Sequence, residues 1–269
     1  RFWDKMKYLN IACGSNFIDE TSWVNLDYKS SKGVKRANLL NKLPFPDFTF
    51  DAIYCSHFVE HIPLKKKDFF LQECFRVLKP MGVLRIVMPD YLFLCKQYII
   101  NLENKDFEKA EFIKILTLDQ CVRTQRGGYL KKYLMRTQDN NNQELKNYIK
   151  EVIGEDFDDL NNFPSLLDRL NLFSLFQALE ILWIRFISIF LPPAFRKQNV
   201  SFASVGEKHT WLYDEESFKK ELIKNNFKEI LPTSYDKSYL GDLFHKLDVH
   251  PLIKKPRKGT HQFFIEAKK

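Results

Sequence analysis

The most constraining feature of the sequence is a short apolar segment that enters a glycine-containing turn and is followed by a second segment ending in an acid. The first segment covers residues 8–12, the turn is Cys13-Gly14-Ser15, and the second segment closes on Asp27. Glycine lets a ligand approach the backbone closely, and a carboxylate at a strand tip accepts hydrogen bonds from ribose hydroxyls. The pattern predicts a Rossmann-like sheet with a nucleoside site at the carboxyl ends of its strands.

The turn differs from the Gly-x-Gly-x-x-Gly turn of a dinucleotide site. It contains one glycine and offers no run of backbone N–H groups for a pyrophosphate. We therefore expect a nucleoside ligand without phosphates, and S-adenosylmethionine (SAM) fits that description.

Strands and helices alternate along residues 1–95. Strands are predicted at 8–12, 23–26, 34–39, 50–55 and 83–88, and the last two are nearly continuous apolar runs, as in central parallel strands. An amphipathic helix is predicted over 64–78, stopped by Pro80 and Gly82. After residue 201 the pattern resumes with a helix over 214–226, capped by Asp214, and strands at 229–233 and 261–267. The fold class is therefore α/β with a mostly parallel sheet.

Residues 96–200 interrupt this pattern with helical periodicity and a polar loop at 139–142. We expect a SAM-binding domain formed by 1–95 plus 201–269, and a helical insertion over 96–200 that acts as a lid and selects the substrate. Within the insertion, residues 172–191 approach the length of a membrane span, but Gln177, Glu180 and Arg185 make a span costly. A buried helix covering the cleft is favoured over a helix on the membrane surface or a dimer contact.

Composition and charge restrict the binding partners and the cellular compartment that we expect for the protein. The five cysteines form no Cys-x-x-Cys pair, so we expect reduced thiols rather than a disulfide framework or a zinc-cysteine site. No secretory signal opens the sequence, and we expect a cytoplasmic protein. The net charge of +8 comes from scattered basic residues without interleaved aromatic residues, which argues against a nucleic-acid partner.

Four sequence blocks, in order, carry a family resemblance. They are Leu-Asn-Ile-Ala-Cys-Gly at 9–14, Trp-Val-Asn-Leu-Asp at 23–27, the run 43–61, and the run 76–87, with a looser match at 209–226. In this order and spacing they resemble the class I SAM-dependent methyltransferases, specifically the small methyltransferase-11-like type found in surface-polysaccharide and other glycan pathways. The resemblance implies a Rossmann-like sheet whose last strand is antiparallel.

The resemblance also implies a set of cofactor-binding residues. The turn after the first strand would pass under the methionine part of SAM, Asp27 would hold the ribose, and Tyr28 would flank the adenine. Asn38 stands where many relatives have an acid, and its amide oxygen can still accept a hydrogen bond. The full set is Asn10, Ala12, Cys13, Gly14, Ser15, Asp27, Tyr28, Asn38, Leu39, Ser56 and His57.

Methyl transfer to a hydroxyl requires a general base, and histidine is the usual one. His57 is the first candidate and His209 the second. His61 and Asp90 are predicted at the same edge, but His61 can simply orient its loop, and Asp90 can cap a helix starting at Tyr91. His57, His61 and Asp90 could together hold a metal, yet nothing else in the sequence requires one, and no metal is expected.

These observations favour a SAM-dependent methyltransferase, with O-methylation of a small-molecule or glycan acceptor in polysaccharide biosynthesis. One alternative is a lipid or lipid-linked acceptor at a membrane surface, contacted through 172–191. Another is a catalytically inactive, methyltransferase-like binding subunit. The sequence is compatible with a homodimer. It does not identify the acceptor.

Overall fold

A seven-stranded sheet is the centre of the computed structural model, which describes residues 6–139, 141–154, 157, 179, 182–203 and 206–269. The strand order is β3-β2-β1-β4-β5-β7-β6. Strands β1 to β5 are parallel, whereas β7 runs antiparallel to both of its neighbours, β5 and β6. The strands are β1 Tyr8–Ile11, β2 Trp23–Asp27, β3 Val34–Arg36, β4 Phe50–Ser56, β5 Leu78–Pro89, β6 Lys228–Thr233 and β7 Gln262–Lys268. The expected Rossmann-like sheet with an antiparallel last strand is confirmed.

Helices follow the predicted positions, and two of them begin at the predicted caps. Asp90 accepts hydrogen bonds from the backbone N–H groups of Leu92 and Phe93, and Asp214 forms a capping box with Ser217. The helices are η1 Val59–His61, α1 Leu64–Val77, α2 Tyr91–Glu103, α3 Phe107–Val122, α4 Gly128–Asp139, α5 Gln143–Ile153, α8 Pro193–Asn199, α9 Glu215–Lys224, η3 Gly241–Phe244 and α10 His245–Asp248.

The main hydrophobic core lies between one face of the sheet and helices α1 and α9. Alternate strand residues such as Ile53 and Ile86 point to this face and pack with Phe70 of α1 and Phe218 of α9. Each of these side chains is almost fully buried, which stabilises the fold by about 1.5–3 kcal/mol per residue.

The opposite face carries a buried polar cluster beneath η3 and α10. Tyr54 of β4, Arg85 of β5 and Glu266 of β7 are neighbours in register across three strands. The Arg85 guanidinium pairs with Glu266 at 2.7 Å and with Asp248 of α10 at 2.8 Å. The Tyr54 hydroxyl donates to the other Asp248 oxygen at 2.6 Å. This cluster fixes α10 against the sheet.

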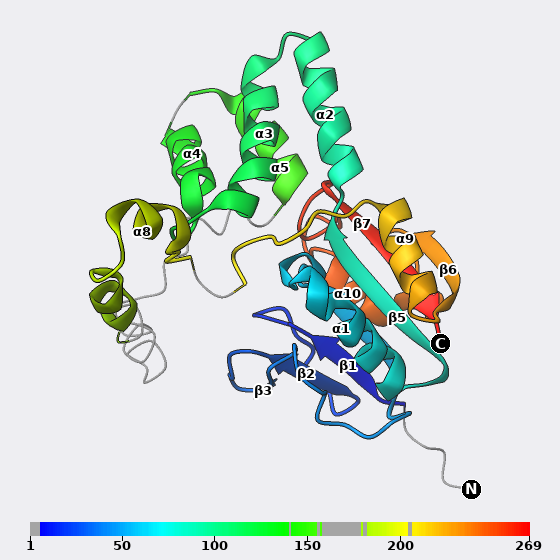
Figure 1. Ribbon diagram of the computed structural model, residues 1–269. Helices are drawn as coiled ribbons and strands as arrows, with labels where there is room; N and C mark the ends of the chain where they lie inside the picture. The colour runs from blue at the N-terminus through cyan, green and yellow to red at the C-terminus, as the bar shows by residue number, and fades with distance from the viewer. Residues whose placement is uncertain (1–5, 140, 155–156, 158–178, 180–181, 204–205) are drawn as a thin grey trace, which may run out of the picture.

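Helices α2 to α5 form a separate body beyond the carboxyl end of β5 (Figure 1). They enclose their own hydrophobic cluster, which includes Phe112, Ile149 and Val152. The chain leaves the sheet at Asp90 and returns at Tyr213, and these two residues form a parallel bridge. The backbone N–H of Tyr91 donates to the Tyr213 carbonyl at 2.8 Å. The helical part therefore starts at Tyr91, slightly before the predicted residue 96, and ends beside its own starting point.

Two sequence expectations need correction. Strand β5 begins at Leu78, directly after α1, so the turn at Pro80 and Gly82 lies inside the strand rather than before it. The expected buried helix over 172–191 is wrong for its described part. Residues 182–188 are helical, but Trp183 is 62% exposed, Phe186 is also exposed, and Phe190 beyond the helix is 76% exposed. Trp183 and Phe186, three residues apart, lie on one side of this helix, and that side faces solvent.

The remainder of that segment, 172–178 and 180–181, lies outside the described residues. Within the described part of the chain, no helix combines the length and the apolar character that crossing a membrane requires. All five cysteines are free thiols, and Cys13, Cys55 and Cys74 are buried, as expected.

Candidate functional site

The turn after β1 is held against the tip of β2. The backbone N–H of Gly14 donates to Asp27 Oδ2 at 2.9 Å, and that of Lys29 donates to Oδ1 at 3.0 Å. Ala12 and Gly14 both have positive φ, 55° and 54°, so the chain reverses sharply here. A Cβ built on Gly14 would meet no atom within 4 Å. The turn is therefore open on the side where a ligand would approach its backbone.

Two buried asparagines hold the loop between β1 and β2 in place. The Asn10 amide donates to the Asn16 carbonyl at 3.1 Å and to Asn25 Oδ1 at 3.2 Å. The Asn25 amide donates to the Ile18 carbonyl at 3.0 Å. These bonds satisfy backbone carbonyls of a loop that contains no helix. Asn10, expected beside the cofactor, directs its amide nitrogen into this loop.

The remaining predicted cofactor residues lie at the carboxyl ends of adjacent strands. Tyr28 follows β2, is 42% exposed, and has the Arg36 guanidinium 5.6 Å from its ring centre. Asn38 Oδ1 accepts the Leu40 backbone N–H at 3.1 Å, so its oxygen shapes the local turn. The Leu39 side chain packs in the main core. Ser56 ends β4, which lies next to β1 in the sheet.

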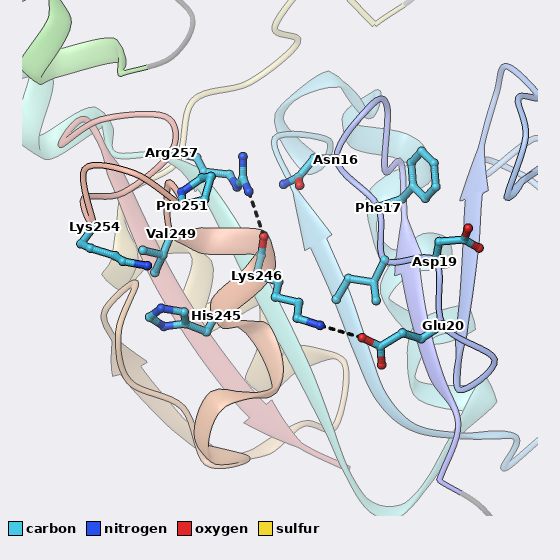
Figure 2. A pocket seen from close by; sticks show the side chains of 11 residues that line it. Asn16, Phe17, Asp19, Glu20, His245, Lys246, Val249, Pro251, Lys254 and Arg257 are labelled. Carbon is cyan, nitrogen blue, oxygen red and sulfur yellow. Dashed lines mark hydrogen bonds and ion pairs between the residues drawn. The ribbon is translucent and has the colours of Figure 1, made fainter.

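A pocket of about 500 Å³ opens beside this turn, between the β1–β2 loop and the segment around α10. Figure 2 shows Asn16, Phe17, Asp19 and Glu20 on one side and His245, Lys246, Lys254 and Arg257 on the other. Lys246 pairs with Glu20 at 2.7 Å across the pocket. None of the predicted cofactor residues lines it, so this pocket is distinct from the turn at Gly14.

The predicted histidines converge on a buried glutamate. Glu60 lies in η1, directly after β4, and its Oε1 is 3.5 Å from His57 Nδ1 and 3.9 Å from His61 Nε2. The ring of His209, which belongs to the segment returning from the helical part, lies 4.7 Å from the ring of His61. The structure thus brings together three of the four groups named as candidate bases or ligands. The fourth, Asp90, caps α2 instead.

Burial dominates the electrostatics of this cluster. It raises the pKa of Glu60 to about 8. Burial also lowers the pKa of His209 to about 3 and that of His57 well below its ordinary value, with smaller contributions from neighbouring basic groups. Among the described residues, neither Glu60 oxygen has a hydrogen-bond partner, and His209 Nδ1 has none.

Hydrogen bonds fix the orientation of two of the rings. His57 Nε2 lies 2.9 Å from Gln262 Oε1, while the Gln262 amide nitrogen donates to the Gly259 carbonyl. This places the proton of His57 on Nε2 and leaves Nδ1 facing Glu60. His61 Nδ1 lies 3.0 Å from the Lys208 carbonyl, which can only accept, so His61 carries its proton on Nδ1.

Sequence reasoning missed Glu60 and Gln262 as members of this cluster. A glutamate in such a sequence position is usually solvated, so Glu60 gives no signal of burial by itself. The signal available was its position between His57 and His61 at the end of a buried strand. Gln262 begins β7, and no local pattern indicated that it would face His57.

Comparisons with known proteins find a methyltransferase-domain match over part of the chain. Residues 20–86 match the model of a methyltransferase domain. An uncharacterized protein of Methanocaldococcus jannaschii is 31% identical over 133 residues, which make up 44% of this chain and 57% of that protein. Phosphoethanolamine N-methyltransferase of Plasmodium falciparum is 34% identical over 85 residues, 32% of this chain and 29% of the enzyme. The chain therefore matches less than two thirds of the length of either relative.

Among solved structures, a SAM-dependent methyltransferase from Archaeoglobus fulgidus aligns over 99% of this chain and 87% of its own, with a TM-score of 0.40 and 13% identity. The domain match covers β2, β3, β4, α1 and most of β5. The domain match thus supports the methyltransferase resemblance for the segment 20–86. The glycan-pathway type stays a prediction.

Proposed function

We propose that the protein is a SAM-dependent methyltransferase. The observation that carries this proposal is the turn at Gly14 and its contact with Asp27, next to a segment that matches a methyltransferase domain. The residues present fit the cofactor, because the Gly14 turn is open where a Cβ would otherwise stand, and a carboxylate lies at the tip of β2. Bound SAM supplies a methyl group already activated by its sulfonium.

In this proposal, Asp27 and the backbone around it bind and orient the cofactor. Each Asp27 oxygen accepts one backbone N–H and has a further lone pair, which leaves the carboxylate able to accept from ribose hydroxyls. The backbone bonds to Gly14 and Lys29 hold that carboxylate in one orientation before any ligand arrives, which reduces the entropy lost on binding.

The proposed acceptor is a hydroxyl of a small molecule or a glycan, selected by the insertion expected over 96–200. Alignment and exclusion of water supply most of the rate enhancement in such a displacement. His57 and His209, named as candidate bases, stay predictions. Of the two, His57 has both ring nitrogens directed at protein groups, Gln262 and Glu60.

The test is thermal stabilisation by S-adenosylhomocysteine, measured on the intact chain and on Asp27→Asn. At about 100 times its dissociation constant, the ligand adds about 2.7 kcal/mol to the free energy of unfolding. We expect a clear upward shift in the intact chain, a much smaller one in Asp27→Asn, and an unchanged one in the control Asp242→Asn. Asp242 is an exposed carboxylate in η3, remote from the turn. An intact chain that shows no shift would overturn the proposal.

A lipid or lipid-linked acceptor is the second candidate, favoured by the exposed aromatic side chains Trp183, Phe186 and Phe190. Leu182 and Ile187 are exposed as well, and such a concentration of exposed apolar side chains suits a contact with a bilayer surface. Co-sedimentation with lipid vesicles tests this contact. Binding that Trp183→Ser and Phe186→Ser together abolish would favour a lipid acceptor, and equal recovery in the supernatant with or without vesicles would exclude it.

A further inference from the structure

We propose that Glu60, His61 and His209 form a binding site for a divalent transition metal of the zinc class. Each residue offers one ligand atom, and these atoms all lie within 4.8 Å of one another. Two imidazole nitrogens and one carboxylate oxygen are a donor set that zinc accepts in proteins. This proposal differs from the sequence-based expectation of no metal. That expectation was based on His57, His61 and Asp90, because the sequence alone does not show that His209 lies beside them.

The orientation of His61 is already that of a ligand. Its Nδ1–H donates to the Lys208 carbonyl at 3.0 Å, so the lone pair is on Nε2, and Nε2 is the atom that lies 3.9 Å from Glu60 Oε1. Metal-bound histidines commonly donate their other ring N–H to a backbone carbonyl, which fixes the tautomer.

Unpaired buried atoms point to a missing partner. Glu60 is 2% exposed and His209 is 6% exposed, yet both Glu60 oxygens and His209 Nδ1 have no hydrogen-bond partner within the described part of the chain. Leaving a buried polar group unsatisfied destabilises a fold by about 1–3 kcal/mol. A cation between these side chains would satisfy the carboxylate and complete the cluster.

The geometry requires a small contraction. Ligand atoms around a tetrahedral zinc are about 3.3 Å apart, given metal–ligand bonds of about 2.0–2.1 Å. The Glu60–His61 separation of 3.9 Å is close to this value, and no separation among the three ligand atoms exceeds 4.8 Å. The nearby Arg123 guanidinium pairs with Asp119 at 2.9 Å, and this carboxylate offsets the repulsion between the guanidinium and a bound cation.

Such an ion would join two parts of the chain that meet here. Thr210 donates to the Glu60 carbonyl through its backbone N–H at 2.7 Å, and its hydroxyl donates to the Ile62 carbonyl at 2.6 Å. The returning segment therefore already lies on η1 through backbone contacts. The metal would add side-chain bonds between the same segments, His61 on the sheet side and His209 on the returning side.

Zinc itself is the probe in the first experiment, on the full chain after dialysis against a chelator. Isothermal titration with Zn²⁺ is expected to give one site per chain, with affinity lowered by about 100-fold or more in Glu60→Gln, His61→Ala and His209→Ala. Two controls, His245→Ala and Cys121→Ser, are expected to bind as the intact chain does. His245 is an exposed histidine in α10, and Cys121 is a partly buried thiol in α3.

Cobalt(II) provides a second measurement that does not depend on the folding of variants. The intact chain with one equivalent of Co²⁺ is expected to show the visible bands of a four-coordinate ion and no thiolate charge-transfer band. Failure of the intact chain to bind either ion would overturn the site, as would thiolate bands or unchanged affinity in both histidine variants. Because neither ion reports on SAM, this result is independent of the proposed methyl transfer.

Discussion

Arg85 and Asp248 form a fully buried ion pair between the middle of β5 and α10, with 2.8 Å between Arg85 Nε and Asp248 Oδ2. Both side chains are 1% exposed, and Glu266 completes the set on the other side of the guanidinium. The guanidinium also donates to the Ser234 and Lys237 carbonyls. A charge this deep is stable only because each of its donors is directed at an acceptor.

Arg85→Met should therefore be strongly destabilising. It leaves Asp248 and Glu266 buried without their cation, a change that typically lowers the free energy of unfolding by about 3–5 kcal/mol. Urea denaturation measures this loss in the free energy of unfolding. The control Lys246→Met breaks the exposed pair with Glu20, and we expect a loss of less than about 1 kcal/mol. Equal losses in the two variants would contradict this account.

Asp248 should also make stability depend on pH. Burial raises the pKa of its carboxyl to about 6, although Arg85 opposes the shift. Between about pH 4 and 6 the folded state then binds more protons than the unfolded state, so the free energy of unfolding falls as pH rises, by up to about 3 kcal/mol. In Asp248→Asn this contribution disappears and the profile becomes flatter over that range.

The control for the pH profile is Asp236→Asn. The Ser234 hydroxyl lowers the pKa of the exposed Asp236 carboxyl, so the contribution of Asp236 has the opposite sign and falls below about pH 4. Denaturation of the intact chain, Asp248→Asn and Asp236→Asn at several pH values gives the slope of the free energy of unfolding against pH for each protein. A slope in Asp248→Asn identical to that of the intact chain would show that Asp248 does not titrate there.

Gly14→Ala separates backbone strain from ligand contact. Gly14 has φ of 54° with open space around its missing Cβ, and Gly241 has φ of 59° with equally open space. Alanine should cost about 1 kcal/mol of stability at either position because of the left-handed conformation. We expect only Gly14→Ala to weaken S-adenosylhomocysteine binding, by about tenfold or more, since its Cβ enters the ligand's space. Titration calorimetry distinguishes the two variants, and equal affinities would argue against a ligand over this turn.

Gly259→Ala should disturb the contact between the helical part and the sheet. A Cβ at Gly259 would lie 2.2 Å from the Val152 carbonyl oxygen, and φ is 74°. We expect a loss of about 2–4 kcal/mol, larger than in Gly241→Ala, because backbone must move. Hydrogen exchange at Thr260 and His261, whose N–H groups donate to this end of α5, reports the change. Protection equal to that of the intact chain would mean that the added methyl group leaves this contact intact, which would contradict the prediction.

Local patterns were sufficient for much of the fold. The strands, the caps at Asp90 and Asp214, and the meeting of Gly14 with Asp27 each depend on short-range signals: apolar runs, a capping residue, a glycine turn. Asn226, at the end of the predicted helix, takes the left-handed conformation that asparagine tolerates, with φ of 70°.

The buried polar clusters depend on contacts that no local pattern contains. Arg85 sits in an apolar strand, and its partners Asp248 and Glu266 come 163 and 181 residues later. His209 reaches Glu60 only because the helical part returns beside its point of departure. The solvent-facing stripe at Trp183 was misjudged for a related reason, since an apolar pattern specifies a stripe but not what it faces.

The bridge between Asp90 and Tyr213 has a consequence for how such a protein can change. Because the helical part leaves and re-enters the sheet at one point, a shorter connection or a different set of helices could be spliced between these residues while both neighbouring strands keep their partners. Such an exchange would keep the contact between Gly14 and Asp27 at the sheet edge, whereas the cluster around Glu60 would survive only if the new connection again supplied a residue like His209.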